Sequence, residues 1–425
     1  MIKDIAELVK AGVISQETAN DIQKYYDQKG SAAPNRLFIV FGVLGAILVG
    51  LGIILILAHN WDELPRWTKT IFAFVPLIVG QILSGFTLLK KAGSVAWRES
   101  SAVLLFFGIG ASIALVAQIY NLSGDLSSFL LTWMLLALPV VYLLKSSATS
   151  LMYIIGITYY VTVNYMKSGP EELYYLLLLL LILPYYFLLI KRQPYGNFTG
   201  FHHWLIPVSL LIVLMSWVHQ NGQLMVIAYM SLLGILYLIG QLDYFARQKI
   251  RRNGYEVLGS LGTVVMLLGL SFDFFWKELR RWDYHQHEAF SSPEFILAVI
   301  LTLVAMGLFI HHIRRRPLRE IQPVAPVFGL FVLVYFLGMS SSLAIVLVNL
   351  LAFGVGVMTI REGAKMNSLG VLNYGLLIIA ALVVCRFFDT HLSFVVRGLL
   401  FVTVGIGFFM VNYWMLKKRK KDEVQ

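Results

Sequence analysis

Hydrophobic residues follow one another along this chain in long runs, which short polar segments separate. A helix needs about 20 apolar residues, with roughly 17 to 25 tolerated, to cross the hydrocarbon core of a bilayer. Fourteen runs approach this length: 37–58, 68–89, 101–120, 126–144, 148–166, 173–190, 203–218, 223–242, 255–275, 295–310, 324–339, 341–360, 368–384 and 393–415. The shortest are 203–218, 295–310 and 324–339. Because the runs are continuously apolar and do not alternate, they predict membrane helices rather than strands.

The composition excludes most other classes of protein. Hydrophobic residues make up 58% of the 425 residues and charged residues 13%, whereas soluble domains contain about 45–50% and 25%. This excludes a soluble enzyme, a disordered regulator and a fibrous protein. The net charge of +11 comes from short basic clusters between apolar runs, which argues against a nucleic-acid-binding surface. The single cysteine, Cys385, excludes an internal disulfide and a CxxC motif.

The basic residues predict how the helices are oriented. With residue 1 on the cytoplasmic side, 26 of the 34 lysines and arginines fall in connectors on that side and 8 on the other. Short cytoplasmic loops carry such an excess of positive charge. The sequence therefore predicts an all-α, polytopic membrane protein with about fourteen transmembrane helices, or twelve if two short runs are lost, and both termini in the cytoplasm.

Polar segments at the two ends predict small cytosolic parts. Residues 1–33 read as a helical hairpin, in which a first helix over 2–10 ends before Gly12 and Ser15 caps a second helix running to about residue 28. The hairpin either lies on the membrane face or docks a partner protein. Residues 37–416 form the predicted transmembrane bundle, and 417–425 a basic cytosolic tail. The first apolar run follows a charged segment, so it predicts a retained anchor rather than a cleavable signal.

Ionisable residues are scarce at mid-depth in the predicted spans, which argues against a relay of buried carboxylates. Those inside or beside the spans lie near span ends, where they can reach water: Asp243, Glu256, Asp273 and Arg397. The deeper polar residues are neutral amides, Gln81, Gln118, Asn349 and Asn373, and such side chains commonly bridge helices.

The predicted outer face concentrates polar residues in three segments. Six of them are candidate substrate contacts: Asp62, Arg66, Gln118, Asp125, Arg386 and Asp389. They either line a substrate-facing vestibule or belong to turns and helix caps within an aromatic belt. The sequence contains no P-loop, no GxSxG and no HExxH motif, and its histidine pair His285 and His287 lacks the spacing of a metal site. No catalytic residue, metal or cofactor is therefore expected.

Several motifs resemble a family of bacterial predicted membrane proteins, domain of unknown function 2157. They are Gly12-Val13-Ile14-Ser15, Asn60-Trp61-Asp62, Glu99-Ser100 and the segment 114–125, followed by Trp133 and Pro139. The end of the chain, with Arg386-Phe387-Phe388-Asp389 and Arg397-Gly398, is similar to the tail of the same or a neighbouring group. The resemblance implies a multi-pass architecture in the bacterial cytoplasmic membrane, and it implies no reaction.

Three functions fit these features. The first is a transporter or a flippase for lipid-linked substrates, with an outward-facing polar vestibule, because nearly all of the chain lies in predicted spans and Pro76, Pro139, Pro184 and Pro207 predict kinked helices. The second is a membrane enzyme that acts on lipid-linked sugars, but its outer loops are short. The third is a non-catalytic scaffold or envelope-stress factor. The expected partners are membrane lipids and a protein at the hairpin, not nucleic acid.

Overall fold

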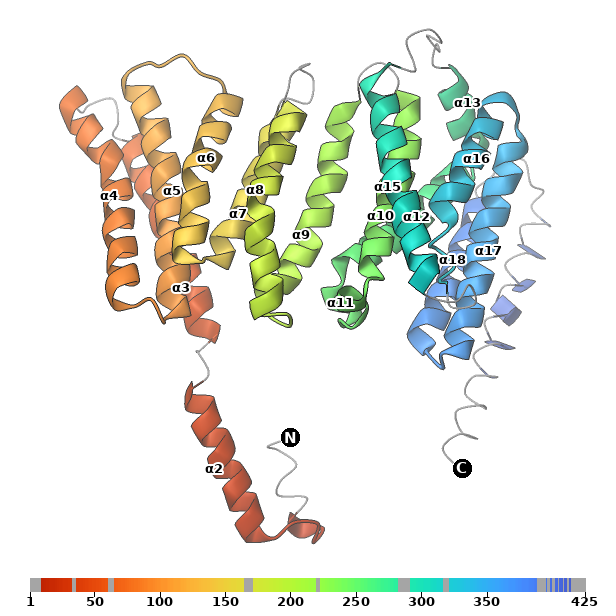
Figure 1. Cartoon of the computed structure of the whole chain (residues 1–425), viewed down its shortest axis with the longest axis horizontal. Coiled ribbons are helices and arrows are strands. Elements are labelled where there is room, and N and C mark those ends of the chain that lie inside the picture. Colours follow the sequence, from red (N-terminus) through yellow and green to blue (C-terminus); the bar gives the residue numbers. More distant parts are fainter. Residues whose placement is uncertain are drawn as a thin grey trace. The chain divides into compact units, whose positions relative to one another are not determined.

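The computed structural model describes residues 9–32, 36–59, 65–163, 171–218, 222–281, 291–315 and 321–387, and single positions between 395 and 413. Within these ranges the chain is helical and contains no strand, which confirms the all-α prediction (Figure 1). The α-helices are α2 (Gln16–Ala32), α3 (Arg36–His59), α4 (Arg66–Lys90), α5 (Val95–Ile119), α6 (Leu126–Leu144), α7 (Ser147–Val163), α8 (Glu171–Arg192), α9 (Asn197–Leu214), α10 (Met225–Gly240), α11 (Asp243–Ala246), α12 (Gly254–Leu270), α13 (Asp273–Arg281), α15 (Pro293–Arg315), α16 (Val327–Ser340), α17 (Leu343–Lys365) and α18 (Leu369–Phe387).

Nine helices in the described ranges are long and apolar enough to cross a membrane, and a bent pair of helices makes a tenth candidate. The chain is therefore a multi-pass membrane protein. Each of the first thirteen predicted runs overlaps a helix, but α7, α16 and the part of α3 that could be tested, Val40–Val49, are shorter than the helices that pass this test. Most of the last run, 393–415, lies outside the described residues. The count of fourteen stays a prediction.

The predicted cap of the N-terminal hairpin is confirmed. Ser15 Oγ accepts a hydrogen bond of 3.1 Å from the backbone N–H of Thr18, so α2 begins at Gln16. Gly12, which precedes the helix, has a φ of +67°, a conformation that glycine adopts without steric cost. Residues 1–8, where most of the first predicted helix falls, lie outside the described residues.

The described part of the chain divides into two compact units. The first contains Met1–Tyr160 and Leu178–Tyr185. Its helices α4 and α5 run side by side (Figure 1), and a cluster of apolar side chains joins α5 to α6: Ala102, Leu105, Ile109, Val140 and Leu144. Gly110 leaves room for the indole of Trp133, whose Nε1 donates to the carbonyl oxygen of Phe106 at 2.8 Å. Gly110 thus serves close helix packing.

The second unit contains Val161–Leu177 and Tyr186–Gln425. Its central helix is α10, on which Ala228, Met230 and Leu236 have no exposed surface. Helices α9, α12, α15 and α16 pack around α10, while α17 pairs with α18 and also contacts α12. An added Cβ at Gly375 would lie 2.6 Å from the backbone nitrogen of Ile360, so the backbones of α17 and α18 are in direct contact.

The structure corrects the predicted continuous span 255–275. Helix α12 ends at Leu270, and α13 leaves it at an angle of 81°. Ser271 Oγ donates to the carbonyl oxygen of Leu268 at 2.5 Å, and the indole of Trp276 donates to that of Leu270 at 2.8 Å. These two bonds occupy carbonyl groups that a continuing helix would have paired with backbone N–H groups. An unbroken apolar run does not reveal such a break.

Contacts within each unit agree with a chain that passes back and forth. In the first unit, Glu99 near the start of α5 hydrogen-bonds to Ser146 and Ser147 before and at the start of α7, so connectors 91–94 and 145–146 share one end. In the second unit, Tyr244 bonds to Pro194 and Arg315 pairs with Asp243. The contacting connectors are those that the sequence assigns to one side. Which side faces the cytoplasm stays a prediction.

Candidate functional site

Three of the predicted contact residues share one end of the first unit. Arg66 is the first residue of α4, Gln118 the last but one of α5, and Asp125 the cap of α6. All three side chains are exposed. A hydrogen bond of 3.2 Å between the hydroxyl groups of Thr70 and Tyr120 brings the start of α4 to the end of α5. The predicted partners Asp62 and Asp389 lie outside the described residues.

Asp125 has a local structural role. Its Oδ1 accepts a hydrogen bond of 2.9 Å from the backbone N–H of Ser128 and so caps α6. Asparagine caps helices about as well as aspartate, whereas Asp→Ala costs about 1 kcal/mol. We expect Asp125→Asn to melt like the wild type in neutral detergent micelles and Asp125→Ala to melt at a lower temperature. A loss of activity in Asp125→Asn would then report on the charge. Equal destabilisation by both variants would contradict the cap.

Arg386, the fourth predicted contact that the structure describes, lies near the end of α18 in the second unit. Its Nη2 donates to Ser271 Oγ at 3.0 Å, and its guanidinium carbon lies 4.8 Å from the centre of the Phe272 ring. The amide of Asn349 donates to the carbonyl oxygen of Ser271 at 3.1 Å. Arg386 and Asn349 thus hold the break between α12 and α13, so Asn349 bridges helices as expected.

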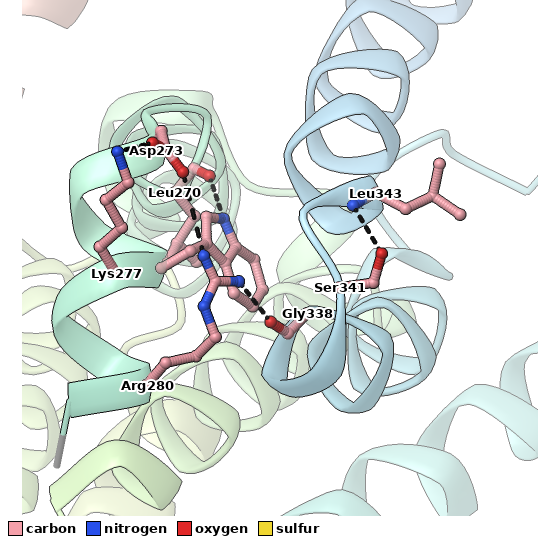
Figure 2. Close-up of polar contacts among 8 residues, drawn as sticks. Leu270, Asp273, Lys277, Arg280, Gly338, Ser341 and Leu343 are labelled. Carbon is pink, nitrogen blue, oxygen red and sulfur yellow. Dashed lines mark hydrogen bonds and ion pairs between the residues drawn. The ribbon is translucent and has the colours of Figure 1, made fainter.

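Helix α13 is fixed beside this break by its own charged residues. Figure 2 shows Lys277 and Arg280 reaching toward Asp273, and Arg280 also reaching toward Gly338 on α16. Lys277 Nζ lies 2.5 Å from Asp273 Oδ2, and Arg280 Nη1 donates to the carbonyl oxygen of Gly338 at 2.8 Å. Asp273 and Lys277 thus pair within α13, while Arg280 joins the helix to α16, so these three side chains form a structural network.

A cavity lies at the opposite end of the second unit. Its volume is about 490 Å³. It is lined by residues of α10, α12, α17 and α18, of the segment before α16, and of the connectors before α12 and α18. Most of the lining surface is apolar, including Ile250, Leu261 and Val371. The polar side chains in the lining are Tyr237, Glu256, Ser260, Gln322, Thr359, Ser368 and Tyr374. We refer to it as the Glu256 cavity.

The carboxyl group in this cavity is held in place by Asn253, the cap of α12. Asn253 Oδ1 accepts from the backbone N–H of Glu256 at 3.2 Å, while its Nδ2 donates to Glu256 Oε2 at 2.7 Å. The same Nδ2 also donates to the carbonyl oxygens of Gly240 at 2.9 Å and Phe245 at 3.2 Å. A fully buried amide therefore joins the end of α10, α11 and the start of α12 around Glu256.

Two hydroxyl groups continue the polar wall. Ser260 follows Glu256 by four residues, so both side chains lie on the same face of α12. Ser260 Oγ lies 2.9 Å from the hydroxyl oxygen of Tyr374 on α18. The cavity thus has a row of one carboxyl and two hydroxyl groups against apolar surroundings. Binding pockets for small molecules commonly combine a few placed polar groups with a mostly apolar lining.

The connector that carries Asn253 is anchored to α9. His203 Nδ1 donates to the carbonyl oxygen of Arg252 at 2.9 Å, and Trp204 Nε1 to that of Arg251 at 3.0 Å. Burial raises the pKa of Tyr244 in α11, so its hydroxyl stays neutral and donates to the carbonyl oxygen of Pro194 at 3.1 Å. The basic side chains at this end include Lys249, Arg251, Arg252, Arg314, Arg315, Arg361 and Lys365.

Sequence reasoning did not identify this cavity. It placed Glu256 near a span end within reach of water, which agrees with the location at the start of α12. The spacing of Glu256 and Ser260 was an available signal, but Tyr374 lies 114 residues further along the chain. In the described residues, no group of three or more histidine, cysteine, aspartate or glutamate side chains is arranged to hold a metal ion.

A second cavity, in the first unit, is almost wholly apolar. Its volume is about 560 Å³, and its lining comes from α4, α5, α6 and Leu122. Gln81 and Ser112 are the polar residues in the lining, and the hydroxyl of Ser112 donates to the carbonyl oxygen of Ala73 at 2.6 Å. The Glu256 cavity has the richer set of polar groups and is therefore the candidate site.

The comparisons with known proteins concern the first part of the chain. No match was found to a curated protein or to a solved structure. Residues 6–150, about a third of the chain, match the model of a family described as "Predicted membrane protein (DUF2157)". This match covers the first unit up to the start of α7 and leaves the Glu256 cavity outside it. The resemblance expected from the motifs is confirmed: residues 6–150 match the domain of unknown function 2157.

Proposed function

We propose that this chain is a transporter or a flippase that binds an amphipathic, lipid-like substrate in the Glu256 cavity. The supporting observation is the division of the cavity into one polar wall, formed by Glu256, Ser260 and Tyr374, and an otherwise mostly apolar lining. A molecule with a polar headgroup and an apolar body satisfies both parts of this surface. The volume of about 490 Å³ is within the range of small-molecule sites.

The location of the cavity also supports this proposal. It lies at the ends of membrane-spanning helices and beside basic connectors, where a lipid-like molecule meets both the apolar region and the aqueous phase. We place these connectors on the cytoplasmic side of a bacterial cytoplasmic membrane, with both termini on that side, as their positive charge predicts. A path from this cavity to the opposite end of the second unit would end near Arg386, at the end of α18. The other predicted contacts, Asp62, Arg66, Gln118, Asp125 and Asp389, stay predictions.

The N-terminal hairpin is proposed to lie outside this path. Helix α2 carries an acidic residue, Glu17, in its first turn and is largely polar. It either rests on lipid headgroups or docks a partner protein, and deletion of residues 1–29 distinguishes an accessory role from an essential one. Transport by the purified, reconstituted chain after this deletion would show that the hairpin is accessory.

A substitution that fills the cavity tests the proposal. Val371 on α18 lines the cavity, whereas Leu377 on the same helix is 60% exposed. Tryptophan at 371 occupies the space of the substrate, while tryptophan at 377 points away from the protein and serves as the matched control. We expect proteoliposomes with wild-type protein or Leu377→Trp to move a fluorescent lipid across the bilayer. Movement should fall at least about tenfold with Val371→Trp, a loss of about 1.4 kcal/mol.

Folding of each variant is checked by its melting temperature in dodecyl maltoside micelles. If Val371→Trp melts normally and still moves the fluorescent lipid at the wild-type rate, the proposed role of the cavity is wrong. Absence of movement with wild-type protein, over a series of anionic, zwitterionic and neutral lipids, would overturn transport itself.

A further inference from the structure

The charge of Glu256 has no partner within the described part of its unit. None of the ion pairs in the described residues includes Glu256, and the side-chain amides of Asn253 and Gln241, which bond to its carboxyl group, are neutral. A carboxylate that is largely removed from water is costly unless a cation or several hydrogen bonds compensate it. Among the described residues, Glu256 thus has hydrogen bonds that fix its position but no opposite charge beside it.

The surroundings of Glu256 are suited to a cationic group. Tyr237 and Tyr374 both line the cavity, and the faces of aromatic rings attract cations. The oxygens of Ser260 and Tyr374, which lie 2.9 Å apart, can accept hydrogen bonds from N–H groups. The lining thus contains a carboxyl group, two aromatic rings and hydroxyl oxygens, which are the kinds of group that bind an ammonium.

We propose that the substrate carries an ammonium group on an apolar body, with the ammonium paired to Glu256. This inference rests on the proposed function, because it names the substrate class of the same cavity. The apolar body contacts residues such as Leu261 and Val371. Two sources supply this chemistry, namely the amine of a phospholipid headgroup and a free amphipathic amine. For a phospholipid, the basic connectors beside the cavity are placed to attract the phosphate.

Binding of two single-chain probes tests the charge requirement. Purified protein in dodecyl maltoside micelles, which contain no amine, is titrated with radiolabelled decylammonium and separately with radiolabelled decanol. The binding that remains in Val371→Trp measures partition into the micelle and is subtracted. We expect wild-type protein to bind decylammonium about 10- to 100-fold more tightly than decanol, the range of a charge-assisted hydrogen bond.

Glu256→Gln removes the charge and retains an oxygen for the bond from Asn253. We expect this variant to melt near the wild-type temperature and to lose most of its preference for decylammonium, while decanol binding stays the same. The matched control is Glu362→Gln, which removes an equal charge from the end of α17, where Glu362 lies 4.0 Å from Lys365 outside the cavity lining. It should keep the preference.

Competition with lipids identifies the source. Displacement of decylammonium by phosphatidylethanolamine, but not by phosphatidylglycerol, assigns a phospholipid headgroup. Displacement by neither lipid assigns a free amphipathic amine. Equal binding of decylammonium and decanol, or an unchanged preference in Glu256→Gln, would overturn the ammonium proposal and leave an amphipath-binding cavity. Binding of neither probe above the Val371→Trp level would instead overturn the proposed function.

Discussion

Replacing Glu99 with alanine is expected to cost roughly 3–5 kcal/mol in the stability of the first unit. Glu99 lies on α5, is 3% exposed and accepts three hydrogen bonds from the segment that starts α7. The donors are the hydroxyl of Ser146 at 2.5 Å and the backbone N–H groups of Ser147 and Ala148, each at 2.9 Å. The carboxyl group of one helix thus caps the next but one along the chain.

The size of this effect follows from burial. Without Glu99, the buried donors at the start of α7 lose their acceptor and have no water to bond to instead. Each buried polar group that is left unsatisfied costs about 1–3 kcal/mol. The negative charge of Glu99 also interacts favourably with the positive end of the α7 dipole. Glu99→Gln should be destabilising as well, because its amide group can accept through one atom only.

Thermal unfolding in dodecyl maltoside micelles measures this prediction, with Asp125→Ala as the control. Asp125 is also a helix cap, which accepts a bond from the backbone N–H of Ser128, but it is exposed, so the loss of this cap costs about 1 kcal/mol. The melting temperature of Glu99→Ala should therefore fall several times further. Equal shifts in the two variants would show that Glu99 is an ordinary surface cap.

The second large effect is expected at Gly259 on α12. A methyl group at this position would lie 2.7 Å from the Cα of Tyr237 and 2.8 Å from the carbonyl oxygen of Leu233. These are backbone atoms of α10, which cannot move aside as the end of a side chain can. Gly259→Ala must therefore separate α10 from α12, at a cost of about 1–3 kcal/mol.

This substitution should also disturb the Glu256 cavity. Helix α12 carries Glu256 and Ser260, and α10 carries Tyr237 on the opposite side of the contact. We expect Gly259→Ala to lower both the melting temperature and the affinity for decylammonium. The matched control is Gly307→Ala on α15, where an added Cβ meets no atom within 4 Å.

Gly307→Ala should keep probe binding and raise helix stability by up to about 1 kcal/mol. A melting temperature of Gly259→Ala at or above that of Gly307→Ala would contradict a tight backbone contact between α10 and α12. If Gly259→Ala is destabilised but binds decylammonium with normal affinity, the binding cavity does not depend on this contact between α10 and α12.

The sequence predicted the helices because lipid imposes a simple rule. A run of apolar residues long enough to cross the bilayer must form a helix, since every backbone N–H and carbonyl group needs a partner inside the chain. The first thirteen predicted runs accordingly overlap helices, and Ser15 caps α2 as expected. Local signals of this kind act over a few residues and can be read from the sequence alone.

The break between α12 and α13 shows where this rule ends. The apolar run continues past Leu270, but a bond from the Trp276 indole and the contacts of Arg386 and Asn349 stabilise a turn there. Arg386 and Asn349 come from helices more than 70 residues away. Their influence on the backbone exists only when the helices are assembled.

The same distinction applies to function. The sequence by itself determined a multi-pass helical protein with basic connectors, because hydropathy and charge are properties of consecutive residues. Only the tertiary structure decided that Glu256 and Ser260 meet Tyr374 in one cavity, and that Glu99 caps α7. Side chains far apart in the chain come together through helix packing, which depends on shape and close contact and leaves no periodic signal in the sequence.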